Sequence, residues 1–104
     1  MKLRQVSVSH MKIYTAETFS TNLTTLPKWK FENNSIERKF VFKDFAEAMS
    51  FMIRVSYTCE AMNHHPDWTN VYNKLTIRLS THDAGGVTDK DIELATAIDR
   101  FKDQ

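Results

Sequence analysis

The sequence predicts an α+β fold in which three helices pack on one face of a four-stranded antiparallel sheet. Two stretches in which apolar and polar residues alternate around asparagine each predict a β-hairpin. A long pattern of helical period lies between them, and a shorter helical pattern lies toward each end of the chain. The predicted order is therefore helix, strand, strand, helix, strand, strand, helix (α-β-β-α-β-β-α).

The composition is that of one ordinary folded domain. The chain has 104 residues, 41% of them hydrophobic and 26% charged. We divide it into an N-terminal extension, residues 1–14, and a single domain, residues 15–104.

Charge and hydropathy exclude several classes of partner. The formal net charge is +1 and no basic run occurs, which argues against nucleic acid. No stretch reaches the roughly 18 apolar residues of a membrane span, so we expect no membrane partner. The first residues lack the apolar core of a signal peptide, and the single cysteine, Cys59, cannot form an intrachain disulfide. We therefore expect a cytoplasmic or nuclear location.

A first helix is predicted from Thr15, as its cap, to about Leu26. Phe19, Leu23 and Leu26 follow a helical spacing and form one apolar stripe. Pro27 ends the pattern. The segment is rich in threonine, which is a poor helix former.

The residues on both sides of Asn33-Asn34 predict the first β-hairpin, with one face toward water. Apolar side chains alternate there with charged and polar ones, and the asparagine pair supplies the turn. The apolar positions are Trp29 and Phe31 before the turn and Ile36, Phe40 and Phe42 after it.

The central helix is predicted from Phe45 to about Met62. Asp44 and Glu47 have the spacing of a capping box at its start. Its apolar residues cover about 240° of the circumference, whereas a single core contact needs little more than about 100°. We infer that one flank packs on the chain's own sheet and the other on another subunit, giving a homodimer or homotetramer. The alternative is a helix buried by the N-terminal segment alone.

A second hairpin follows the central helix. Its first arm runs from Trp68 to Tyr72, and its second carries alternating apolar residues from Leu75 to Leu79. Asn73 occupies the turn.

A glycine-containing loop and a last helix complete the chain. The loop spans residues 81–87, and its pair Gly85-Gly86 permits positive φ and close approach of a ligand. Thr88 and Asp91 form a second capping box. The helix that follows carries an apolar stripe made of Leu94, Ala97, Ile98 and Phe101.

Three of the four histidines gather around the second hairpin. His64 and His65 precede its first arm, and His82 follows its second arm. Because the start of one arm of an antiparallel hairpin lies beside the end of the other, these imidazoles are expected to converge. His10 stands apart and is interpreted as a surface residue.

Such a cluster suits proton transfer, since imidazole gives and takes protons near neutral pH. Two imidazoles on opposite sides of a substrate can expel a hydroxyl as water from a carbon next to a nitrogen. Trp68 and Tyr72 are candidates for a flat apolar wall, and the backbone of Gly85 and Gly86 for contacts with a heterocycle.

Other interpretations of the histidines remain open at this point. They can be ordinary surface or turn residues, and His-His before Pro66 can simply end a helix. A zinc site of three histidines is a further alternative, although adjacent side chains in extended chain point in opposite directions. Asp67, Asp83 and Asp91 can orient imidazoles, although Asp91 is already explained by its capping box.

Three segments of the second half carry long motifs. They read Glu60-x-x-Asn63-His64-His65-Pro66-Asp67-Trp68, then Asn70-Val71-Tyr72-Asn73-Lys74-Leu75, then Leu79-Ser80-Thr81-His82-Asp83-Ala84-Gly85-Gly86-Val87-Thr88-x-x-Asp91. The sequence thereby resembles the pterin-4a-carbinolamine dehydratase family. The likeness extends upstream through Trp29 and Phe40–Phe45 and covers residues 15–101.

The resemblance implies a function, an assembly and a set of site residues. The implied reaction is dehydration of 4a-hydroxytetrahydropterin to quinonoid dihydropterin, which recycles tetrahydrobiopterin without a metal or other cofactor. Family members assemble as dimers of dimers through the long helix. Vertebrate members also act as dimerisation cofactors of a homeodomain transcription factor, so a transcription factor partner is the rival function. The implied catalytic residues are His64, His65 and His82, and the implied substrate-binding residues are Glu60, Asn63, Pro66, Asp67, Trp68, Ser80, Thr81, Asp83 and Asp91.

The motif departs from other members at Asn63, where aspartate is common. Asparagine cannot take up a proton, so a carboxylate relay through this position is absent, whereas hydrogen bonding remains available.

Overall fold

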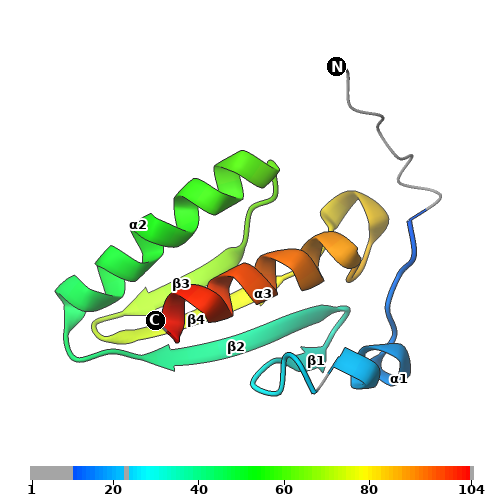
Figure 1. The fold of residues 1–104 in the computed structure, drawn as a ribbon, viewed down its shortest axis with the longest axis horizontal. Coiled ribbons are helices and arrows are strands. Elements are labelled where there is room, and N and C mark those ends of the chain that lie inside the picture. Colours follow the sequence, from blue (N-terminus) through cyan, green and yellow to red (C-terminus); the bar gives the residue numbers. More distant parts are fainter. Residues whose placement is uncertain (1–10, 23, 104) are drawn as a thin grey trace.

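The computed structural model describes residues 11–22 and 24–103, and within them it has the predicted order of elements. The predictions for His10 and Leu23 lie outside the described residues. The helices and strands are α1 (Ala16–Phe19), β1 (Lys30–Glu32), β2 (Ser35–Val41), α2 (Phe45–Met62), β3 (Asp67–Val71), β4 (Lys74–Leu79) and α3 (Asp89–Lys102), with 3-10 turns η2 (Ser20–Asn22) and η3 (His82–Ala84) (Figure 1).

The four strands form one antiparallel sheet in the order β1-β2-β4-β3. Asn33 and Asn34 both have positive φ, 52° and 59°, as a two-residue hairpin turn of type I′ requires. The two hairpins join through β2 and β4, whose register runs from Ile36 opposite Leu79 to Val41 opposite Lys74. This pairing sets where each arm of the second hairpin ends, and with it the position of the histidines.

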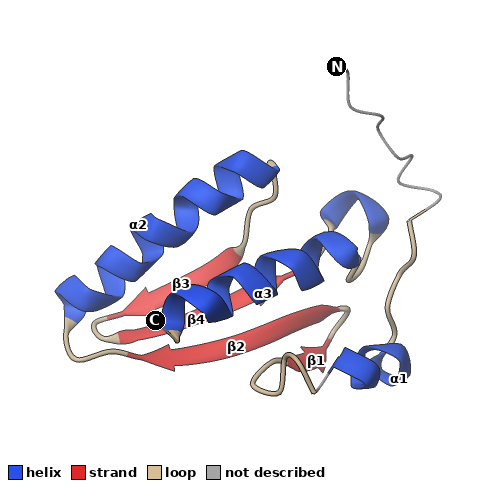
Figure 2. Ribbon diagram, viewed as in Figure 1, coloured by secondary structure: helices blue, strands red, loops and turns tan. Residues whose placement is uncertain are grey.

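The helices α2 and α3 lie on one face of the sheet, as predicted (Figure 2). The core between these layers is apolar and closed to solvent. Its members include Ile36, Phe40, Leu75, Ile77 and Leu79 from the strands and Val55, Cys59, Leu94 and Ile98 from the helices. Burial raises the pKa of the Cys59 thiol above its usual value.

The first helix is shorter than predicted. It ends at Phe19 and continues as the 3-10 turn η2, although Phe19 and Leu26 are both buried as the apolar stripe requires. The hydroxyl of Thr21 donates to the carbonyl of Thr18 at 2.8 Å, and that of Thr25 donates to the carbonyl of Asn22 at 3.2 Å. Such bonds give the backbone alternatives to a regular helix, which explains the early end.

Residues before α1 are tied to the domain. Tyr14 pairs with Val87 in an isolated bridge, and its hydroxyl donates to Asp89 at 2.6 Å. That hydrogen bond, with some burial, raises the pKa of Tyr14. The boundary between residues 14 and 15 stays a prediction, and Tyr14 already contacts the folded part.

The central helix has the predicted bounds and cap, with one difference. Asp44 accepts from the amide of Glu47 at 2.8 Å, but the Glu47 carboxylate accepts from the amide of Lys43 instead of that of Asp44. The over-wide apolar arc is divided as expected. Val55 on one flank is fully buried, whereas Ile53 and Tyr57 on the other are 53% and 74% exposed within the described chain.

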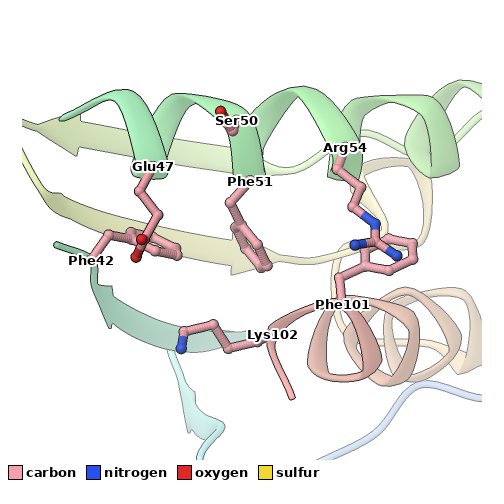
Figure 3. A pocket seen from close by; sticks show the side chains of 7 residues that line it. All are labelled: Phe42, Glu47, Ser50, Phe51, Arg54, Phe101 and Lys102. Atoms are coloured by element: carbon pink, nitrogen blue, oxygen red, sulfur yellow. The ribbon is translucent and has the colours of Figure 1, made fainter. Parts of the chain in front are cut away.

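A cleft of about 390 Å³ separates the first half of α2 from the end of α3. In Figure 3, Glu47, Phe51 and Arg54 extend from α2 toward α3. The guanidinium of Arg54 lies 4.6 Å from the centre of the Phe101 ring, which links the two helices by a cation–π contact.

Candidate active site

The three predicted histidines line one cavity of about 310 Å³, so their convergence is confirmed. The cavity lies where the end of α2 meets the segment between β4 and α3. It is lined by Asn63, His64, His65, Ser80, Thr81, His82, Asp83 and Lys90. The catalytic roles of these residues stay a prediction.

The end of α2 determines where His64 lies. Asn63 adopts the left-handed conformation, with φ 51° and ψ 44°, which asparagine tolerates better than most residues. The amide of His64 then donates back to the carbonyl of Cys59 at 3.0 Å, which is the hydrogen bond of a Schellman-type helix end. The chain turns there, and Pro66 prevents the helix from continuing. His64 is buried as a result, with 8% of its surface exposed.

His64 is paired with a buried carboxylate. Its Nε2 lies 2.5 Å from Oδ1 of Asp91, which has no exposed surface. The other oxygen, Oδ2, accepts from the hydroxyl of Thr81 and from the amide of Thr88, each at 2.9 Å. Asp91 therefore completes the predicted capping box of α3 and also orients His64. The sequence allows both roles for Asp91, and in the structure one side chain fills both.

His65 is more exposed than its neighbour. Its Nε2 lies 2.8 Å from Oε1 of Glu60 in the last turn of α2, and both side chains are more than half exposed. The two adjacent histidines thus differ in environment: His64 is held by a buried partner, whereas His65 contacts an exposed one.

His82 reaches the cavity from η3. Thr81 precedes this turn, and Gly85 follows it with φ 76°, a left-handed conformation that glycine adopts without strain. The amides of Gly85 and Gly86 donate to carbonyls of Thr81 and His82. These amides hold the turn, and the predicted contact of the Gly85-Gly86 backbone with a heterocycle stays a prediction. At Gly86, the group that approaches the backbone closely is the side chain of Ile13. A Cβ atom on residue 86 would lie 2.9 Å from Ile13 Cγ2.

The remaining predicted residues lie at different distances from the cavity. Ser80 and Asp83 line it. Pro66, Asp67 and Trp68 do not; Trp68 packs against the core, and Asp67 pairs with Arg78 at the start of β3. Tyr72 is wrongly predicted as a wall of the site. It lies in the β3–β4 turn, whereas the histidines lie at the other end of that hairpin.

Lys90 is a lining residue that sequence reasoning missed. It occupies the first turn of α3, next to Asp91 and inside the second capping box. The capping box that places Asp91 beside His64 also places the residues next to Asp91 near the cavity. Lys90 could have been predicted from that signal.

No group of three or more histidine, cysteine or acidic side chains in residues 11–22 and 24–103 is arranged to hold a metal ion. Nor does that part of the chain contain a helix with the length and hydropathy needed to cross a membrane.

An α+β domain that brings three imidazoles to one small cavity, one of them paired with a buried carboxylate, is of a class suited to moving protons on a small polar ligand. The chain belongs to the pterin 4 alpha carbinolamine dehydratase family, whose pattern it matches over residues 12–101.

Individual relatives agree with this assignment. A protein of Synechococcus sp. (strain WH7803), named provisionally as a pterin-4-alpha-carbinolamine dehydratase, is 53% identical over 75 residues, which cover 72% of this chain and 81% of the relative. A protein of Burkholderia vietnamiensis with the same provisional name is 50% identical over 88 residues, covering 83% and 86%.

A solved structure shares the fold. The crystal structure of a transcriptional coactivator/pterin dehydratase from Brucella melitensis superposes with a TM-score of 0.81 at 34% identity. The match covers 86% of this chain and 97% of that one.

Proposed function

We propose that this chain dehydrates 4a-hydroxytetrahydropterin to quinonoid dihydropterin and water, and so takes part in recycling tetrahydrobiopterin. Family membership supports the substrate class. The observation that carries the proposal is the single cavity lined by His64, His65 and His82, with His64 backed by the carboxylate of Asp91.

The reaction needs one proton delivered and one removed. The bond between C4a and its hydroxyl breaks with both electrons leaving on oxygen, and a protonated imidazole supplies the proton that completes water. A neutral imidazole takes the proton from N5, and the N5–H electron pair forms the new C4a=N5 bond. The reaction transfers only these two protons and releases the hydroxyl as water. It therefore requires no redox partner.

The proposed roles follow from the environments of the histidines. His64 and His82 exchange protons with N5–H and the 4a-hydroxyl. His65 holds the pterin, and its exposed contact with Glu60 leaves it free to reorient. Ser80, Asp83 and Asn63 offer polar groups at the cavity wall.

The test is an absorbance assay with freshly generated carbinolamine. His82→Ala is expected to lower turnover by about 10²- to 10⁴-fold, the usual contribution of one general acid or base, while the fold is retained. His10→Ala is the matched control, because His10 is not part of the proposed cluster, and it should keep the activity of the parent chain. A His82→Ala variant with full turnover would refute the proposed role.

A second candidate function is a dimerisation or coactivator role toward a transcription factor. The exposed apolar flank of α2, with Phe45, Ile53 and Tyr57, favours it, because such a flank suits packing against other helices. The name of the Brucella melitensis relative supports the same possibility for that protein. Incorporation of a partner's helices in place of a second copy of this chain, observed by pull-down and mass determination, would favour this function.

A further inference from the structure

A buried chain of hydrogen bonds runs from the start of α3 to the imidazole of His64. The hydroxyls of Thr88 and Thr81 are 2.5 Å apart, Thr81 Oγ1 is 2.9 Å from Asp91 Oδ2, and Asp91 Oδ1 is 2.5 Å from His64 Nε2. Thr88 and Asp91 have no exposed surface, and Thr81 is 5% exposed. Water therefore does not compete for these bonds.

The protons in this chain have one consistent direction. A hydroxyl carries a single proton, and Thr81 gives its proton to Asp91. The proton between the two threonines must then come from Thr88, whose oxygen in turn accepts from the amide of Lys90 at 3.3 Å. Every donor in the chain thus points toward Asp91.

The direction of these hydrogen bonds determines which oxygen of Asp91 is left to accept from His64. Oδ2 is occupied by two donors, the Thr81 hydroxyl and the Thr88 amide, so Oδ1 is the oxygen left for the imidazole. Since Asp91 accepts on both oxygens, the proton of the short contact lies on Nε2 of His64.

The other ring nitrogen of His64, Nδ1, has no hydrogen-bond partner among the described residues. Every buried polar side-chain atom in that part of the chain has a partner, so Nδ1 keeps some exposed surface. Since His64 lines the cavity, we infer that Nδ1 is reached from there.

We propose that Thr81 and Thr88 are positioning residues, whose hydroxyls hold Asp91 so that His64 keeps its proton on Nε2 and presents an unprotonated Nδ1 to the substrate. The inference rests on the proposed function and deepens it. His64 is then the group that takes the proton from N5, and His82 the group that gives one to the hydroxyl. Thr81, which the family resemblance implies as a substrate ligand, acts instead through Asp91, since its only proton is already donated.

The first test reads the tautomer of His64 in the unmodified protein without substrate. Long-range ¹H–¹⁵N correlation spectra distinguish a protonated from an unprotonated ring nitrogen, and His64→Gln assigns the signals. At a pH where the ring is neutral, the proton is expected on Nε2. A proton on Nδ1, or an equal mixture of the two tautomers, would overturn the proposal.

The second test removes one hydroxyl. Thr81→Val keeps the β-branched shape but leaves Asp91 Oδ2 with one donor, whereas Thr81→Ser keeps the hydroxyl. We expect Thr81→Val to lower kcat about 10- to 100-fold, the usual effect of losing a group that orients a functional histidine, with a smaller change in KM. The Nδ1–H tautomer of His64 should appear in the same variant, and Thr81→Ser should restore both values.

Thr96→Val is the matched control. It removes a part-buried hydrogen bond within α3 that lies away from the cavity, from the Thr96 hydroxyl to the carbonyl of Ile92 at 2.8 Å. Equal kcat in Thr81→Val and Thr81→Ser, with an unchanged tautomer, would refute the proposal. If Thr81→Val does not fold, Thr81→Ala removes the same hydroxyl and is compared with Thr81→Ser by the same two readouts. A chain with no dehydratase activity would refute the proposed function, and the substrate-free spectra would still test the positioning.

Discussion

Asp99 on α3 accepts hydrogen bonds from two residues that lie far from it in the sequence. Its Oδ1 is 2.9 Å from Trp29 Nε1 and 2.5 Å from Arg38 Nη1. Trp29 is 1% exposed and Arg38 is 6% exposed, so neither donor has water as a replacement. One carboxylate thus ties the segment before β1, strand β2 and helix α3 together.

Asp99→Ala is therefore expected to lower the free energy of unfolding by about 3 kcal/mol, because it leaves a buried guanidinium without its partner. That is a large part of the total stability of a domain of this size. Urea unfolding followed by circular dichroism measures the loss. Glu37→Ala is the matched control: it breaks the ion pair with Arg78, whose side chain is 48% exposed, and should cost much less. Equal losses in the two variants would contradict this account.

At the level of single residues, the sequence predicted that the histidines converge, but it did not single out the partner that His64 takes. Hairpin geometry sufficed to bring His64 and His82 together, since both flank the same two arms. The partnership of Asp91 with His64 depends on how α3 packs against the end of α2, and no local pattern reports that packing. The family resemblance implies Thr81 as a substrate ligand, which stays a prediction: Thr81 lines the cavity, and its hydroxyl is buried against Asp91.

At the level of elements, local signals decided which predictions held. The start of α2 is marked by Asp44, so its bounds follow from the sequence. The first helix was overestimated because its hydroxyl side chains bond to nearby carbonyls, a competition that apolar spacing does not reveal. The Glu47 carboxylate likewise accepts from the amide of Lys43 and not from the predicted amide of Asp44. These amides are neighbours in the chain, and the spacing of a capping box does not distinguish between them.

The β3–β4 turn contains a strained residue. Tyr72 has φ 52°, in the left-handed region that costs a residue with a Cβ about 1–2 kcal/mol, and its side chain is 63% exposed. Asparagine tolerates positive φ better than tyrosine does, and it occupies the other non-glycine positions with positive φ in the described chain, Asn33, Asn34 and Asn63. Tyr72→Asn is expected to raise the free energy of unfolding by about 0.5–1 kcal/mol.

The measurement is again urea unfolding, with Tyr72→Phe as control. Phenylalanine keeps the ring and the cost of the positive φ, so this exchange should leave the free energy of unfolding nearly unchanged. A loss of stability in Tyr72→Asn would mean that the tyrosine ring contributes more than the strain costs.

At the level of the whole molecule, the proposed catalytic cavity and the exposed flank of α2 are separate surfaces. The cavity is lined by residues of one chain, between Asn63 and Lys90. The flank presents Phe45, Ile53 and Tyr57, which are 47%, 53% and 74% exposed. Burying such side chains contributes about 1.5–3 kcal/mol each, so a second copy of this helix is the simplest partner for the proposed homodimer or homotetramer.

The double variant Ile53→Glu with Tyr57→Glu is therefore expected to be a monomer, whereas the parent chain forms a dimer or tetramer. Light scattering coupled to size-exclusion chromatography measures the mass of each at micromolar concentration. Val71→Glu is the control, because Val71 is an equally exposed apolar residue, 67%, on the edge strand β3, and its exchange should leave the assembly intact. Since the cavity belongs to one chain, the monomeric variant should keep most of its dehydratase turnover, which would separate catalysis from assembly. A parent chain that elutes as a monomer would refute the proposed assembly, and dissociation by Val71→Glu alone would move the interface to the sheet edge.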